Sequence, residues 1–199
     1  MKDRALRKRL LEVAGDPAFA QSPERQLRLA ENSVRLVMEA VALGHWDQAL
    51  ALAASSWRFE LLALLSERMT DDERSHMLSS WWTSCDGHIY PRRKEVLNWL
   101  EESGYIGSLE RPTETVTIYR GASSSAHKLG LSWSLDADVA RHFASRSPTS
   151  TGVLYSAVAP PEAFLAGFEG LGPSAHVVNP RFLTNVSDVG KVRPSRAKA

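Results

Sequence analysis

Four residues in the second half of the sequence have the types and spacing to bind an anionic ligand. Arg120 follows a β-branched run, and its planar guanidinium suits phosphate or carboxylate. Gly121 has no side chain, so a ligand can reach its backbone amide and carbonyl. Ser132 and Ser134 alternate with bulky residues, which in a strand places both hydroxyls on one face. Together they predict a small polar floor in an apolar cleft, although an Arg-Gly pair alone is more often a turn.

Strands must position these side chains, and we expect them only in the second half of the chain. β-branched and alternating runs predict strands at residues 115–119, 131–135, 152–158 and 176–178, and residues 182–192 could hold one more. Asp136 is the expected N-cap of a short helix that contains Ala140 and Phe143. The apolar segment 164–168 is too short to assign to either type.

Helices are expected throughout residues 1–104, where apolar residues recur at helical spacing. Ser22-Pro23-Glu24 is a typical helix start, and Thr70 to Glu73 has the pattern of a cap with acids in the first turn. Gly44 and Gly104 are expected helix ends. The fold class is therefore predicted as α+β, with an N-terminal helical lobe at 1–110 followed by a small mixed β-sheet domain at 111–199.

Composition narrows the functional classes. The chain has 199 residues and a net charge of +1, so overall charge indicates neither nucleic acid nor membrane as a partner. Cys85 is the single cysteine, which favours a reducing, cytoplasmic setting, and we find neither a secretory signal nor a membrane span. His76 and His88 flank Cys85 without any standard zinc spacing, so no metal site is predicted. Aromatic residues in the helical half, Trp57, Trp81, Trp82 and Trp99, are expected in the core.

In this order and spacing, the motifs resemble those of the ADP-ribosyltransferase family. That family has an Arg at the end of its first sheet strand, a Ser-x-Ser strand and an acidic residue before a late strand. Residues 119–121 (Tyr-Arg-Gly) resemble the first element and residues 132–134 (Ser-Trp-Ser) the second. The sequence is most similar to the short phage and bacterial toxin-like branch, which also has an Ala-x-x-Phe-Ala-x-Arg helix like residues 140–146. The resemblance covers roughly residues 115–192.

The resemblance implies a site for NAD, as substrate, in a cleft between two small sheets. Arg120 would grip the pyrophosphate or the adjacent ribose, and the Gly121 main chain would hold the nicotinamide carboxamide. Ser132 would fix the nicotinamide ribose, with Ser134 supporting it. Tyr119 or Phe143 could pack against a ring. The reaction would break the bond between nicotinamide and ribose, with a carboxylate stabilising the oxocarbenium-like transition state.

The expected catalytic acid is missing. Where the family has Ser-Glu-x-Val-Val-x-Pro, residues 174–180 place Ala175 at the acidic position. The chain could be a deliberately inactivated form with Glu replaced by Ala, Glu169 could supply the carboxylate instead, or the protein could be an inactive relative that only binds. We favour the first, because the rest of the pattern is intact and active toxins are hard to express. His176 beside this position could be a substrate contact, but we expect it at an exposed strand edge.

The sequence therefore predicts an NAD-dependent mono-ADP-ribosyltransferase, a toxin or phage-conflict effector that modifies a macromolecule. Pro173 stands where arginine-modifying members carry Glu and guanine-modifying members often carry Gln, so the acceptor stays open among protein, RNA, DNA and a small molecule. The helical lobe could recognise the target, cover the cleft or dock an antitoxin or other neutralising protein. The alternatives are an inactive NAD- or nucleotide-binding module, and a helical interaction protein whose sheet domain is a scaffold.

Overall fold

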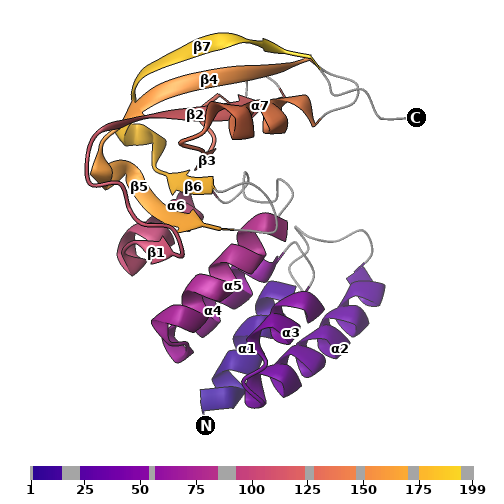
Figure 1. Cartoon of the computed structure of the whole chain (residues 1–199). Coiled ribbons are helices and arrows are strands. Elements are labelled where there is room, and N and C mark those ends of the chain that lie inside the picture. Colours follow the sequence, from indigo (N-terminus) through magenta and orange to yellow (C-terminus); the bar gives the residue numbers. More distant parts are fainter. Residues whose placement is uncertain are drawn as a thin grey trace. The chain divides into compact units, whose positions relative to one another are not determined.

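The computed structural model describes residues 2–14, 23–53, 57–84, 93–123, 128–146, 151–169 and 175–193. Helices precede two small sheets (Figure 1), which confirms the predicted α+β class. Chain contacts define two compact units, Met1–Trp99 and Leu100–Ala199. This division comes before the boundary expected after residue 110, because strand β1 (Ile106–Gly107) pairs with a strand of the second unit. Each unit is described by itself below.

The first unit is helical, as predicted, and its helices bury an aliphatic and aromatic core. Its elements are α1 (Lys2–Ala14), α2 (Pro23–Ala42), α3 (Trp46–Leu52), α4 (Arg58–Leu65), η3 (Ser66–Arg68), α5 (Asp71–Ser84) and the start of α6 (Arg93–Ser103). The residue predicted to cap α2, Ser22, lies outside the described residues, and α2 ends before Gly44, whose φ is +72°. Within the described residues, no helix is long and apolar enough to cross a bilayer.

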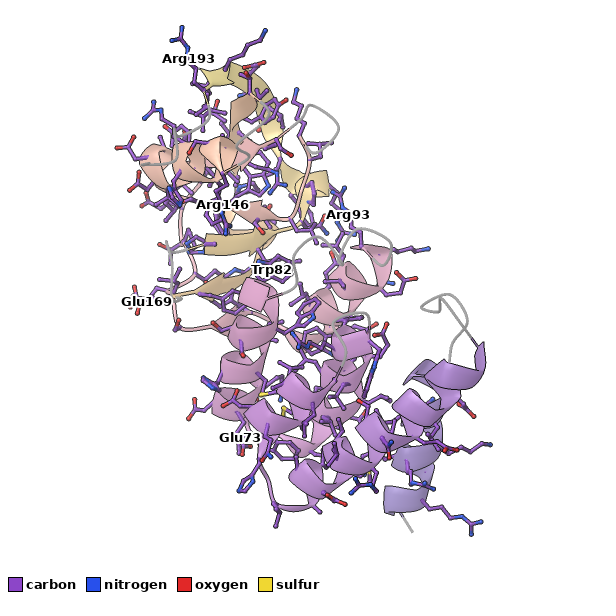
Figure 2. The ribbon with its side chains drawn as sticks, turned by 90° about the vertical axis from the view of Figure 1, so that its right-hand side faces the viewer. Glu73, Trp82, Arg93, Arg146, Glu169 and Arg193 are labelled. Atoms are coloured by element: carbon purple, nitrogen blue, oxygen red, sulfur yellow. The ribbon has the colours of Figure 1, made fainter. Side chains whose placement is uncertain are left out.

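Three of the four tryptophan residues expected in the core are buried there, and the fourth, Trp99, is half-buried. Trp57, Trp81 and Trp82 are buried, and Trp82 lies on α5 (Figure 2). The Phe59 ring centre is 5.3 Å from that of Trp81 and 6.0 Å from that of Trp99. The cluster is thus explained by packing, and no ligand cage is needed to account for it.

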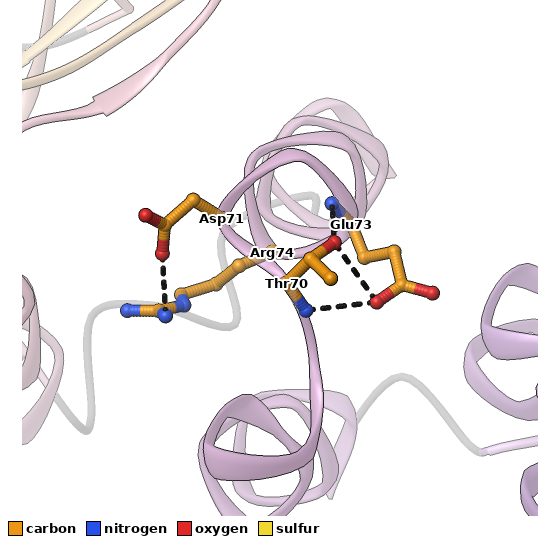
Figure 3. A network of polar contacts seen from close by, with 4 residues as sticks. All are labelled: Thr70, Asp71, Glu73 and Arg74. Carbon is orange, nitrogen blue, oxygen red and sulfur yellow. Dashed lines mark hydrogen bonds and ion pairs between the residues drawn. The ribbon is translucent and has the colours of Figure 1, made fainter.

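A capping box starts α5, as predicted (Figure 3). The Thr70 hydroxyl accepts from the Glu73 N–H at 3.3 Å, and the Glu73 carboxylate accepts from the Thr70 N–H at 2.8 Å. The same carboxylate accepts from the Trp46 indole N–H at 2.8 Å, which joins α3 to α5. The Thr70 backbone bond, followed by the Trp46 bond, holds the pKa of Glu73 below its ordinary value.

The second unit contains the two sheets. Its elements after β1 are β2 (Val116–Ala122), β3 (Ser132–Trp133), α7 (Ala137–Ser145), β4 (Gly152–Ala159), η6 (Pro161–Ala163), β5 (Phe164–Phe168), β6 (Ala175–Val178), η7 (Pro180–Phe182) and β7 (Thr184–Val192). Within the described residues, one sheet has the order β1-β5-β6-β3 and the other β2-β4-β7. Only β1 and β5 run parallel, so the first sheet is mixed.

The predicted strands are present, with four differences. β3 covers only Ser132–Trp133 of the expected run 131–135, and Ser134 follows it as an isolated bridge. β2 continues through Arg120 to Ala122 and does not end at the arginine. Segment 164–168, which we left unassigned, is a strand. β1 was not predicted, because two residues carry too little pattern to distinguish a strand.

Backbone packing fixes α7 against the second sheet. Asp136 caps this helix as predicted, accepting from the Asp138 N–H at 2.7 Å. A methyl group added at Gly121 would overlap the backbone of Ala140 and Ala144, and one at Gly152 would overlap the Ala144 carbonyl. Neighbouring strand residues alternate faces, so α7 lies on the face of β2 opposite to Ile118 and Arg120. Ile118 belongs to the core cluster shared with Trp133, Phe164 and Val178.

Candidate functional site

Among the described residues, the two sheets are joined by one isolated backbone bridge. Tyr119 donates to the Ser134 carbonyl and accepts from the Ser134 N–H, both at 2.8 Å. If this ladder continued, Gly121 would pair with Ser132, but the bridge is isolated and no such pairing follows it among the described residues. β2 and β3 therefore diverge directly beyond the bridge. We call this place, defined by residues 119–121 and 132–134, the β2–β3 corner.

Gly121 presents an amide edge to the β2–β3 corner. Backbone groups alternate sides along an antiparallel strand, so those of Gly121 turn to the same side as those of Tyr119, toward β3. Within the described residues, the N–H and C=O of Gly121 have no hydrogen-bond partner on that side. One donor and one acceptor side by side match the two hydrogen-bonding groups of a primary amide.

Arg120 is anchored in the same corner. Its side chain is 9% exposed, and Nη1 donates to the Ser132 carbonyl at 2.6 Å. The backbone of Gly130 lies against the guanidinium, and a methyl group there would overlap Nη2, Cζ and Nε of Arg120. The guanidinium is a planar set of donors, a geometry that suits phosphate or carboxylate. Gly130 was not assigned to the site from the sequence, although it opens the Gly-Leu-Ser-Trp-Ser run (residues 130–134), which is part of the resemblance.

The two serines lie at the corner, with different environments. Ser134 is buried, and its hydroxyl accepts from the Asp136 N–H at 3.0 Å, which links the end of β3 to the cap of α7. Ser132 is half-buried, and its carbonyl holds Arg120. The arrangement suits Ser134 for support and leaves Ser132 partly accessible.

Strand register brings Ala175 to the same corner. Trp133 of β3 pairs with His176 of the antiparallel strand β6. Ser134 follows Trp133 and Ala175 precedes His176, so both residues adjoin this pair. Ala175 is half-buried and pairs with Phe168 on its other side. The three sequence motifs, far apart in the chain, thus converge through the bridge and the β3–β6 register.

The prediction of an exposed strand-edge histidine at 176 is wrong. β6 lies between β5 and β3, and His176 is 4% exposed. Its ring packs edge-on against Phe164 at 5.2 Å, and Nδ1 is buried without a hydrogen-bond partner among the described residues. Burial lowers the pKa of His176. The error arose because the neighbouring strand β5 had not been assigned.

Glu169 lies one residue beyond β5. Its side chain is exposed and projects away from the ribbon in Figure 2, and its backbone N–H donates to the Ser108 hydroxyl at 2.9 Å. Strand β6 lies between β5 and β3, so β5 is about 10 Å from the strand that carries the serines. The structure therefore places Glu169 farther from Ser132 than Ala175 is.

The two candidate ring contacts, Tyr119 and Phe143, lie on β2 and α7. Tyr119 forms the bridge itself and is half-buried. Phe143, 37% exposed, precedes Ala144, whose backbone N–H approaches Gly121, and its ring has the Arg146 guanidinium 5.3 Å from its centre. Phe143 therefore lies on the helix that packs against Gly121 and is partly accessible from solvent.

No metal centre emerges in the parts of the chain that the structure describes, where no group of three or more His, Cys, Asp and Glu is suited to one. His76 contacts Asp47 at 2.9 Å, while Cys85 and His88 lie outside the described residues.

Comparisons with protein-family models, with curated proteins and with solved structures found no match for this chain.

Proposed function

We propose that this protein is an NAD-dependent mono-ADP-ribosyltransferase of the bacterial and phage toxin type, with NAD bound at the β2–β3 corner. The observation that carries the proposal is the single Tyr119–Ser134 bridge. Because the strands part beyond it, an amide edge, a buried guanidinium and a serine surround one point. These are the groups needed for a carboxamide, a phosphate and a ribose hydroxyl.

Each residue has a role in the proposed complex. The Gly121 N–H and C=O bind the nicotinamide carboxamide, and Arg120 binds the pyrophosphate or the adjacent ribose. Ser132 binds the nicotinamide ribose, while Ser134 supports the strand through the cap of α7. Phe143 and Tyr119 pack against a ring of the ligand.

The proposed reaction transfers ADP-ribose to a macromolecule. The bond between the nicotinamide nitrogen and ribose C1′ breaks, and its electron pair leaves with nicotinamide. An acceptor nucleophile bonds to C1′ and releases its proton to the solvent. Positive charge develops on the ribose in between, so a nearby carboxylate accelerates the reaction. The methyl group of Ala175 cannot supply this carboxylate.

We further propose that alanine at position 175 stands in place of a glutamate. Ala175 adjoins the Trp133–His176 pair, so a longer side chain at this position starts from the strand next to the serines. Glu169 is the second candidate, but it lies beyond the intervening strand and is exposed.

Nicotinamide release from NAD tests this proposal. Ala175→Glu should release nicotinamide far faster than the parent chain, whereas Ala175→Gln, which has the same size without the charge, should stay near the parent rate. Adding Arg120→Ala to Ala175→Glu should abolish the gain. Expression of Ala175→Glu should also be toxic to a bacterial host.

Different results select the alternatives. If Ala175→Glu binds NAD without cleaving it, the binding module without turnover is correct, which Ala175 itself favours. If the parent chain cleaves NAD and Glu169→Gln stops it, Glu169 is the catalytic acid. If Arg120→Ala changes neither NAD affinity nor partner binding, the sheet domain is a scaffold. Mass spectrometry of RNA and protein from cells that express Ala175→Glu would then identify the acceptor by its added ADP-ribose.

A further inference from the structure

Lys128 is a second cation beside the candidate site. Its Nζ lies 5.8 Å from the centre of the Tyr155 ring, and its side chain is half-buried. A cation over an aromatic face is attracted by the ring electrons, which holds the ammonium group in place. None of the sequence motifs drew attention to this lysine.

Two separate observations place Lys128 near Arg120. Tyr155 of β4 pairs directly with Arg120 of β2, so the two side chains are cross-strand neighbours on one face. Gly130, two residues after Lys128, lies against the Arg120 guanidinium. Both the sheet register and the approach to β3 therefore bring the ammonium group to the Arg120 side of the corner.

We propose that Lys128 binds the pyrophosphate of NAD together with Arg120, an inference that rests on the proposed function. A pyrophosphate carries two negative charges, and two cations from different segments can each meet one phosphate. Arg120 offers a planar fork of donors, while Lys128 offers a compact charge on a flexible stem. Partial burial strengthens the attraction of Lys128 for phosphate relative to a fully exposed lysine.

Titration of the full chain with NAD and with ADP-ribose tests Lys128. Lys128→Met keeps an apolar stem against Tyr155 but removes the charge, and it should weaken both ligands roughly tenfold at low salt. The difference should shrink at high salt, because the lost interaction is ionic. Lys128→Arg should keep affinity near that of the parent chain. Lys191→Met, at an exposed position on β7, is the matched control and should have no effect.

The outcomes separate this inference from the proposed function. If Lys128→Met binds both ligands as tightly as the parent, Lys128 is only a packing residue. The same conclusion follows if its affinity is lower than that of the parent by the same factor at every salt concentration. If the parent chain binds neither NAD nor ADP-ribose, the NAD site itself is absent and both proposals fall.

Discussion

Arg120 and Gly130 form a matched pair at the scale of single residues. The guanidinium occupies the space that any side chain at position 130 would take, and it reaches the Ser132 carbonyl through that space. The orientation of Arg120 thus depends on a residue that carries no chemistry of its own.

Gly130→Ala should therefore weaken NAD binding without unfolding the protein. The added methyl meets the end of a flexible side chain, which can move, and does not meet rigid backbone. We expect NAD affinity to fall at least about tenfold while the melting temperature changes little. Calorimetric titration and thermal unfolding measure the two effects, with Ser123→Ala, at an exposed position after β2, as the control. Unchanged NAD affinity would show that Arg120 does not need this position.

His176 should make stability depend on pH. Burial lowers the folded-state pKa of His176 from the ordinary value of 6.5. Below pH 6.5 the unfolded chain therefore binds a proton at this residue more readily than the folded chain does. Stability is then complete above about pH 6.5 and falls as the pH drops from there toward the folded-state pKa, by at most about 1.4 kcal/mol per pH unit. Urea unfolding between pH 5 and 8 should show this slope in the parent and a flatter one in His176→Leu. An equal slope in both would contradict the assignment, and His45→Gln, at an exposed position, serves as the control.

At the scale of elements, α7 is the helix that completes the candidate site. Its N-cap is joined to Ser134, and its body lies on Gly121 and Gly152. A glycine on each of two adjacent strands allows the helix backbone to approach closely.

Gly121→Ala and Gly152→Ala should both destabilise the protein, by about 1–3 kcal/mol each, because the new methyl meets rigid helix backbone. Only Gly121→Ala should also reduce NAD affinity, since Gly121 alone offers its amide edge to the β2–β3 corner. Urea midpoints and NAD titration at a temperature where both variants are folded separate the effects. Equal affinities in the two variants would remove Gly121 from the site.

The capping box makes a separate prediction for the helical unit. Thr70→Ala removes the acceptor for the Glu73 N–H and should cost about 1 kcal/mol of unfolding free energy. Since hydrogen bonds lower the pKa of Glu73, its stabilising effect is present at neutral pH and lost as the pH falls through that lowered value. Thr70→Ser should keep the cap. A Thr70→Ala variant as stable as the parent would show that the box contributes nothing.

At the scale of the whole molecule, the sequence predicts the types of the elements better than it predicts how those elements pair. Thr115 to Tyr119 has the β-branched alternation of a strand, and Asp136 is a clear cap, so both could be predicted locally. The Tyr119–Ser134 bridge and the Trp133–His176 pair join segments with no local signal for each other. The burial of His176 was missed for the same reason, because it depends on a neighbouring strand.

The sequence motifs named residues of the candidate site, and the strand pairing in the structure brings those residues together. Arg120, Ser132 and Ala175 were named from the resemblance, and the backbone pairing brings them to one corner. Gly130 precedes the Ser-x-Ser strand in the sequence, but its role comes from the Arg120 guanidinium that lies against it in the fold. Lys128 is in none of the motifs, and its role comes from its contact with the Tyr155 ring.

Titration of NAD into the parent chain tests the central claim most directly, because the enzyme and the binding module both require it. We expect saturable binding of one NAD per chain, weakened at least about tenfold by Arg120→Ala and unchanged by Arg35→Ala, an exposed arginine on α2. Absence of NAD binding, or equal affinity in the parent and Arg120→Ala, would contradict an NAD site at the β2–β3 corner.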